Sequence, residues 1–186
     1  VCRKNNIILI VDDVRTGFRI DLKGSNNFFG FSPDLICLGK AIANGYPISA
    51  LVGKDSLKES AENVYFTGTQ FLNSAPMAAA KATIDELVKQ DAVTKMNNFG
   101  NLLKESLVKI AEDFDVKMIV SGVPAMPYFR IEDEDKTLHS RWVDACLSKG
   151  LYLTDYHNHF ISVAHEEEHL KKVEDIARAA FEVVKL

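Results

Sequence analysis

Apolar residues form short continuous runs in the first third of the chain. Uninterrupted runs cover residues 7–11 and 35–38, and a third strand is predicted at residues 48–52, where Ser49 breaks the apolar pattern. Uninterrupted runs of this length are typical of strands that are covered on both faces of a parallel sheet. Residues 17–33, between the first two runs, are rich in Gly, Asn, Ser and Phe and show no helical period. We therefore expect a long loop there, with one short turn at most, of a length that is usually functional.

Helical and extended patterns alternate in the rest of the chain. Pro76 falls in the first turn of an Ala-rich helix that continues to residue 88, a position where proline is tolerated. Residues 97–114 repeat apolar side chains every three or four positions and predict an amphipathic helix that leads into a second domain. The other predicted elements are strands at 116–120, 126–131, 151–154 and 160–163, a helix at 136–149 and a last helix from Glu166. The order predicts an α/β region over residues 1–92 and an α+β region over residues 93–186.

The amino-acid composition argues against several classes of protein. The 186 residues are 47% hydrophobic and 26% charged, with a formal net charge of -4 and a pI of about 5.7. This balance gives no basic face for nucleic acid or an anionic membrane. No apolar stretch approaches the roughly 20 residues of a membrane span, and no signal peptide opens the chain. Cys2, Cys37 and Cys146 are odd in number and widely spaced, which indicates reduced thiols and a soluble protein of the cytoplasm.

Asp12 and Lys40 are the strongest candidates for chemistry. Asp12 closes the first apolar run, and Lys40 follows the second run 28 positions later. A lysine delivered by an apolar segment and followed by small residues is poised to be desolvated, which frees its amine as the nucleophile of a Schiff base. Two plainer interpretations stay open at this point. Lys40 could be a surface lysine at a strand end, and Asp12 could cap the following turn.

Three ordered motifs indicate a family. The chain resembles the second half of a class III (subgroup II) aminotransferase of fold type I, dependent on pyridoxal 5′-phosphate (PLP), and within it the glutamate-1-semialdehyde aminomutase-like branch. The resemblance implies a large domain with a mostly parallel three-layer sheet, of which residues 1–92 are the second half, and a C-terminal α+β small domain over residues 93–186. The motifs are residues 8–19, residues 33–40 and Gly68-Thr69, with residues 160–165 closing the similarity.

The resemblance assigns roles to four residues. Lys40 would hold PLP as a Schiff base and move a proton between substrate and cofactor. Asp12 would pair with the protonated pyridine nitrogen, and Val14 would pack against a face of the ring. Thr69 would offer its hydroxyl and N–H to the cofactor phosphate of the neighbouring subunit, which makes a homodimer part of the mechanism. In its plainer interpretation, Thr69 is simply a loop residue.

The resemblance also predicts what is absent or altered. Val1 is not an initiator, so the N-terminal half, with most of the phosphate cradle, is expected to be missing from this chain. Asp13 stands where the family usually has Glu, and residues 70–76 replace a Ser-Gly-Asn-Pro-like stretch. Arginines suit carboxylate recognition, but none is singled out as a substrate clamp. The four arginines considered are Arg15, Arg19, Arg130 and Arg141.

The predicted reaction is exchange of an amino group between an amine donor and an aldehyde or keto acceptor. The nearest alternative is the intramolecular transfer of glutamate-1-semialdehyde 2,1-aminomutase, which uses the same lysine and the same proton shift. A zinc hydrolase using His165, Glu166 and His169 matches the H-E-x-x-H pattern, with His157 and His159 as further candidate ligands. The three glutamates equally suit the start of a helix, so we predict no metal site. A non-catalytic relative is the last alternative.

Overall fold

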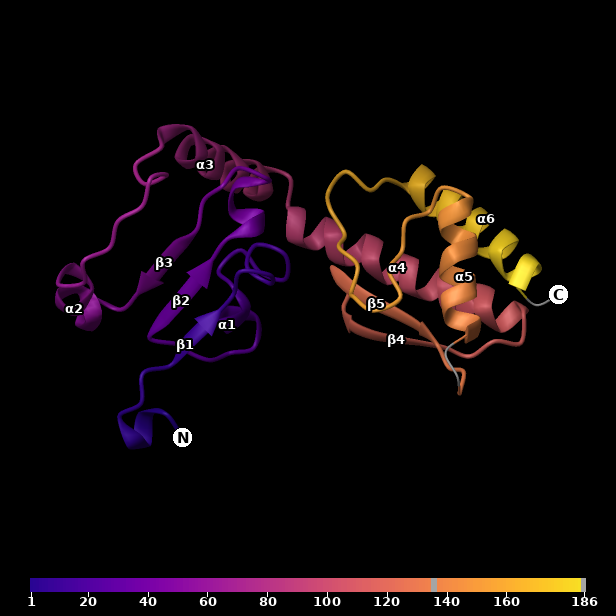
Figure 1. Ribbon diagram of the computed structural model, residues 1–186, viewed down its shortest axis with the longest axis horizontal. Coiled ribbons are helices and arrows are strands. Elements are labelled where there is room, and N and C mark those ends of the chain that lie inside the picture. Colours follow the sequence, from indigo (N-terminus) through magenta and orange to yellow (C-terminus); the bar gives the residue numbers. More distant parts are fainter. Residues whose placement is uncertain (135–136, 185–186) are drawn as a thin grey trace. The chain divides into compact units, whose positions relative to one another are not determined.

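The chain folds into two compact units, each described by itself. The computed structural model describes residues 1–134 and 137–184, and the units are Val1–Val93 and Thr94–Leu186 (Figure 1). No helix within the described ranges has both the length and the apolar character needed to cross a membrane.

A three-stranded sheet forms the centre of the first unit. It consists of β1 (Ile10–Asp12), β2 (Leu35–Leu38) and β3 (Ala50–Gly53), in that order (Figure 1). β1 and β2 run parallel, and β3 runs antiparallel to β2. The strand predicted at 35–38 is confirmed. β1 is shorter than expected, because the Leu9 N–H donates to the Asp34 carboxylate (2.8 Å) in place of a ladder bond.

Only one face of this sheet is covered within the unit. Leu38 of β2 and Ala50 of β3 pack against a group of buried apolar residues, the core cluster. On the other face, Ile10 and Leu51 are 57% and 61% exposed. The described residues of this chain therefore cover one face of the sheet and leave the other face exposed. The core cluster consists of Phe18, Ile42, Ala43 and Ala80.

Helices flank the sheet at positions that local sequence explains. The helix expected at Pro76 is α3 (Ser74–Lys89), and Pro76 lies in its first turn. The Asn73 side chain caps α3 by accepting from the Ala75 N–H (3.2 Å), which satisfies one of the free donors of the first turn. The remaining helical segments of this unit are η1 (Arg3–Asn5), α1 (Ser25–Phe28), η2 (Lys40–Ala43), η3 (Asp55–Leu57) and α2 (Lys58–Glu62). The short α1 lies in the predicted loop.

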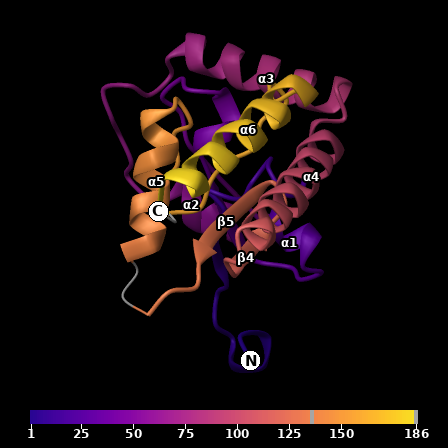
Figure 2. The same ribbon diagram turned by 90° about the vertical axis from the view of Figure 1, so that its right-hand side faces the viewer.

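Within its described residues, the second unit consists of a β-hairpin and three helices (Figure 2). The strands β4 (Met118–Val123) and β5 (Met126–Ile131) pair antiparallel, close to their predicted positions. The amphipathic helix is α4 (Ala92–Asp113), which begins five residues before the predicted start. α6 (Glu167–Val184) lies against α4, since Arg178 pairs with Asp113 at 2.7 Å. The helix predicted at 136–149 is α5 (Thr137–Ser148) within the described ranges, and residue 136 lies outside them.

The prediction of strands at 151–154 and 160–163 is wrong, because the segment between α5 and α6 forms a loop. Its backbone bonds to side chains as well as to the sheet. The Thr154 N–H donates to Nε2 of His159 (3.2 Å), while the His159 N–H donates to the Pro127 carbonyl (2.7 Å). The Ile161 N–H donates to the Ala125 carbonyl (3.0 Å). Polar side chains that bond to nearby backbone thus replace a regular ladder.

Stability of the second unit should depend on pH through His159. Burial lowers the pKa of the His159 imidazole, and the neighbouring His157 and His139 lower it further, while the Pro127 carbonyl opposes the shift. The unfolded chain therefore takes up its proton first, at a pH of about 6.5. The free energy of unfolding should fall as the pH drops below that value, measured by urea denaturation at several pH values. His159→Asn should make the fall shallower, and equal slopes in wild type and His159→Asn would contradict the prediction.

Candidate active site

The carboxyl ends of β1 and β2 bring Asp12 and Lys40 to one edge of the sheet. The strands are parallel, Asp12 pairs in register with Cys37, and Lys40 follows Cys37 by three residues. Adjacent strands lie about 4.8 Å apart and rise about 3.3 Å per residue, so the two Cα atoms are on the order of 10 Å apart. This edge is the position at which ligands bind in open α/β sheets.

The backbone of Lys40 is held in an unusual conformation. Its φ angle is +44°, in the left-handed region that residues other than glycine rarely adopt. Ile42 and Ala43, which follow Lys40 in η2, are buried in the core cluster and anchor the turn. Local strain that the surrounding packing maintains is concentrated at functional sites. Lys40 itself is exposed, whereas Ala41 and Ala43, which follow it, pack with the core cluster.

Asp12 takes part in the turn that follows β1. Its residue is exposed, and Oδ1 accepts from the Val14 N–H at 3.1 Å. The plainer interpretation of Asp12 as a turn cap is therefore correct for one oxygen. A carboxylate has two acceptor oxygens, so capping the turn leaves Asp12 able to accept from a ligand as well.

Val14 lies between the two candidate residues. Its N–H bonds to Asp12, and its side chain packs against Gly39, the residue before Lys40. A Cβ atom at Gly39 would lie 3.3 Å from Cγ1 of Val14, which shows how closely the two segments approach. The structure thus brings Asp12, Val14 and the Lys40 turn together.

Asp13 differs from its neighbour Asp12 in a way that the sequence did not reveal. It is 1% exposed, while its neighbour Asp12 is exposed. The Asp13 carboxylate accepts from the Thr16 hydroxyl and from the Ser25 N–H (2.8 Å). Thr16, three residues after Asp13, is a local signal of such a bond, but the partner at Ser25 depends on the path of the loop.

Thr69 lies in the exposed loop between α2 and α3. In the same loop the Phe66 and Phe71 rings are 4.8 Å apart, and Phe71 packs against Gly68. The described contacts of the chain do not link Thr69 to Asp12, Val14 or Lys40. The hydroxyl is accessible to a ligand or to another subunit.

Arginine contacts do not select a substrate clamp. The Arg19 Nε donates to the Arg15 carbonyl (3.0 Å), and burial lowers the pKa of Arg19. Arg130 and Arg141 are exposed on the second unit.

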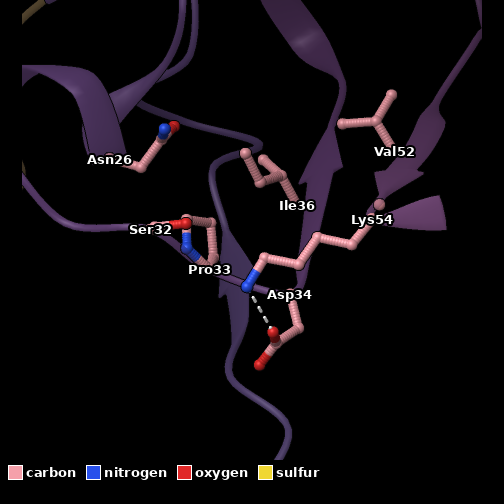
Figure 3. A pocket seen from close by; sticks show the side chains of 8 residues that line it. Asn26, Ser32, Pro33, Asp34, Ile36, Val52 and Lys54 are labelled. Atoms are coloured by element: carbon pink, nitrogen blue, oxygen red, sulfur yellow. Dashed lines mark hydrogen bonds and ion pairs between the residues drawn. The ribbon is translucent and has the colours of Figure 1, made fainter. Parts of the chain in front are cut away.

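A surface hollow of about 250 Å³ lies at the opposite end of β2 (Figure 3). There Lys54 pairs with Asp34 at 2.7 Å, and the Leu9 N–H and Lys54 lower the pKa of the Asp34 carboxyl. Asp34 immediately precedes β2 and Lys54 immediately follows β3. The hollow is therefore separate from the edge that holds Asp12 and Lys40.

The histidines of the H-E-x-x-H pattern have local partners. His165 precedes α6, and its Nδ1 accepts from the Ser162 N–H (3.0 Å). His169 lies in α6, and its Nδ1 accepts from the Glu166 N–H (3.0 Å). The two residues therefore do not share a helix face as a zinc protease requires. Among residues 1–134 and 137–184, no group of three or more His, Cys, Asp or Glu side chains could hold a metal ion.

Comparison with known proteins gives a consistent result over nearly the whole chain. The family model "Aminotransferase class-III" matches residues 1–178. Aminopentol aminotransferase of Sphingopyxis macrogoltabida is 34% identical over 184 residues, which cover 98% of this chain and 44% of the relative. Glutamate-1-semialdehyde 2,1-aminomutase of Legionella pneumophila (strain Paris) is 32% identical, covering 95% of this chain and 45% of the relative.

Solved structures agree with the sequence comparison. The PLP internal aldimine form of the Sphingopyxis sp. MTA144 FumI protein superposes with a TM-score of 0.95 at 33% identity, over 99% of this chain and 45% of that one. An omega-transaminase from Sphaerobacter thermophilus shares the fold with a TM-score of 0.87 at 19% identity, over 100% of this chain and 46% of that one. The predicted resemblance and the predicted fold class are confirmed. The chain spans a little under half the length of these relatives.

Proposed function

Because the chain belongs to the class-III aminotransferase family, we propose that it forms the lysine-bearing part of a PLP-dependent enzyme that moves an amino group between an amine donor and an aldehyde or keto acceptor. The proposal rests on one observation above all: two parallel strands end at one edge of a sheet with Asp12 and the strained Lys40, and Val14 contacts both segments.

The residues at this edge fit PLP. When bound, PLP supplies an aldehyde that condenses with amines and a pyridine ring that withdraws electrons from the attached carbon. The Lys40 amine is the group that would attach the cofactor, and once displaced by substrate it would accept and return the proton that moves during transfer. The Asp12 carboxylate would hold the pyridine nitrogen protonated. The apolar side chain of Val14 would lie against the ring.

Assembly of the whole enzyme is part of the proposal. We assign residues 1–92 to the PLP-binding large domain and residues 93–186 to the small domain. Thr69, exposed in its loop, would bind the cofactor phosphate of a second subunit in a homodimer. The substrates would be small amines and carbonyl compounds, and the enzyme would work in the cytoplasm.

An aminomutase is the second candidate, since both kinds of enzyme occur among the relatives at similar identity. The two differ in their need for a second substrate. Without a carbonyl acceptor, an aminotransferase stops after one half-reaction, because the donor's amino group stays on the enzyme. An aminomutase returns the amino group to the same molecule and continues. Steady-state assays with and without an acceptor distinguish them.

Chemical labelling tests the cofactor assignment. The full-length protein is incubated with PLP, reduced with borohydride, digested and analysed by mass spectrometry. Borohydride fixes an imine as a stable secondary amine, so the label should lie on Lys40. A label on other lysines, with none on Lys40, would overturn the proposal.

Asp12→Asn tests the carboxylate. An amide cannot hold the pyridine nitrogen protonated, so we expect kcat to fall by about 10²–10³-fold, the usual cost of removing one preorganised electrostatic partner. The amide oxygen can still accept from the Val14 N–H, so the fold should be retained in circular dichroism. Asp55→Asn, at an exposed position in η3, is the matched control and should keep wild-type kcat. Wild-type kcat in Asp12→Asn would remove Asp12 from the site.

A further inference from the structure

Asp13 carries a buried carboxylate that has no part in the roles proposed for Asp12, Val14 and Lys40. We propose that Asp13 is a positioning residue, which acts through Val14 to hold Asp12 and the Lys40 turn in register. This inference rests on the proposed function, because it concerns the geometry of the same site.

Asp13 joins three separate segments at the carboxyl edge of the sheet. Its N–H donates to the Cys37 carbonyl of β2 (2.9 Å), and its own carbonyl accepts from the Gly17 N–H (2.8 Å). The side chain accepts from the Thr16 hydroxyl and from the Ser25 N–H at the start of α1 (2.8 Å). Backbone and side chain together fix β1 to β2 and to the loop that follows β1.

The surroundings of Asp13 leave little space for movement. A Cβ at Gly24, where φ is +91°, would lie 2.6 Å from the Asp13 carboxylate, and a Cβ at Gly17 would lie 2.9 Å from the Asp13 carbonyl. Gly17 also approaches Leu38 of β2. At both glycines the backbone comes closer to Asp13 than any side chain would permit, and the carboxylate therefore has one well-defined position.

Val14 links Asp13 to the residues of the proposed site. It follows Asp13 directly, and its N–H donates to Asp12 Oδ1 (3.1 Å). Its side chain packs against Gly39, whose neighbour is Lys40. Any rotation of the chain at residue 13 would therefore move the Asp12 carboxylate and the support of the Lys40 turn together. Displacements on the order of 1 Å at a reacting centre cost about 100-fold in rate.

Four variants of the full-length protein separate positioning from mere folding. Asp13→Ala removes both side-chain bonds. Asp13→Asn can keep both, because its amide oxygen accepts from Ser25 while the Thr16 hydroxyl turns to accept from its NH₂ group. Thr16→Val removes one bond, and Thr16→Ser restores the hydroxyl. Circular dichroism and thermal unfolding first establish the temperature at which each variant is folded.

Four quantities are then measured for each folded variant: the Kd of PLP, the pH at which the visible band of the bound cofactor changes, and the kcat and KM for amino transfer. We expect Asp13→Ala to lower kcat by about 100-fold with a smaller change in KM, and to shift the pH of the spectral change. Thr16→Val should show the same changes to a smaller extent. Asp13→Asn and Thr16→Ser should resemble wild type.

Wild-type kcat and an unshifted spectral titration in folded Asp13→Ala would overturn the inference. If Asp13→Ala does not fold, Thr16→Val decides by the same two readouts. The proposed function has its own criterion, since borohydride labelling of Lys40 in the wild type does not depend on any Asp13 variant. A labelled Lys40 with unaffected variants would therefore refute only the role of Asp13.

Discussion

Replacing Lys40 with alanine should reduce kcat/KM for amino transfer by at least about 10⁴-fold. The substitution removes the amine that would attach the cofactor and also the group that would move the proton, and proton transfer alone contributes about 10²–10⁴-fold. The fold should survive, because Lys40 is exposed and its turn is anchored by Ile42 and Ala43. Alanine also removes a long side chain without changing the neighbouring core.

Lys54→Ala is the matched control for this substitution. Lys54 lies in the same unit and pairs with Asp34 at the opposite end of β2, outside the proposed site. It should keep wild-type turnover and wild-type labelling, whereas Lys40→Ala should lose both. The measurements are steady-state kinetics and mass spectrometry after borohydride reduction. Normal turnover in Lys40→Ala would contradict the assignment.

Trp142→Ala should lower the free energy of unfolding of the second unit by about 3–5 kcal/mol. Trp142 is fully buried and stacks on Phe181, with ring centroids 5.2 Å apart. Its indole N–H points to the Ala177 carbonyl at 3.5 Å, which joins α5 to α6. Truncation leaves a cavity that these two helices cannot close without losing their other contacts. Urea denaturation followed by circular dichroism measures the change.

The control for Trp142→Ala is Tyr152→Ala. Tyr152 is also a large aromatic residue of the second unit but is 74% exposed, so its removal should change stability little. A loss of less than about 1 kcal/mol in Trp142→Ala would show that α5 and α6 repack around the vacated space.

The pattern of apolar residues predicted those helices and strands whose signals lie within the segment itself. The strand at residues 35–38 and the helix beginning near Pro76 could be located because their patterns and caps are local. The same local reasoning failed for the strands predicted at 151–154 and 160–163. The apolar pattern of these residues is typical of strands, but imidazole and hydroxyl groups of the same segment bond to its backbone instead.

The sequence indicated which residues belong to the candidate site but not the full geometry of that site. Asp12 and Lys40 could be selected because each follows an apolar run, and parallel strands place such positions at one edge. Their roles remain predictions. The contact of Val14 with Gly39, the contrast between buried Asp13 and exposed Asp12, and the positive φ of Lys40 could not be predicted, since each depends on how segments distant in sequence pack.

The sequence by itself determined the strands at 35–38 and 126–131, the helix that contains Pro76, the family and the candidate pair Asp12 and Lys40, because apolar runs, helix caps and ordered motifs are properties of neighbouring residues. Only the tertiary structure decided that Asp13 is buried while Asp12 is exposed, and that the H-E-x-x-H pattern is divided at a helix start. Adjacent residues of a chain point in different directions once it is folded. Their burial and partners are then set by the segments packed around them, which the local pattern does not contain.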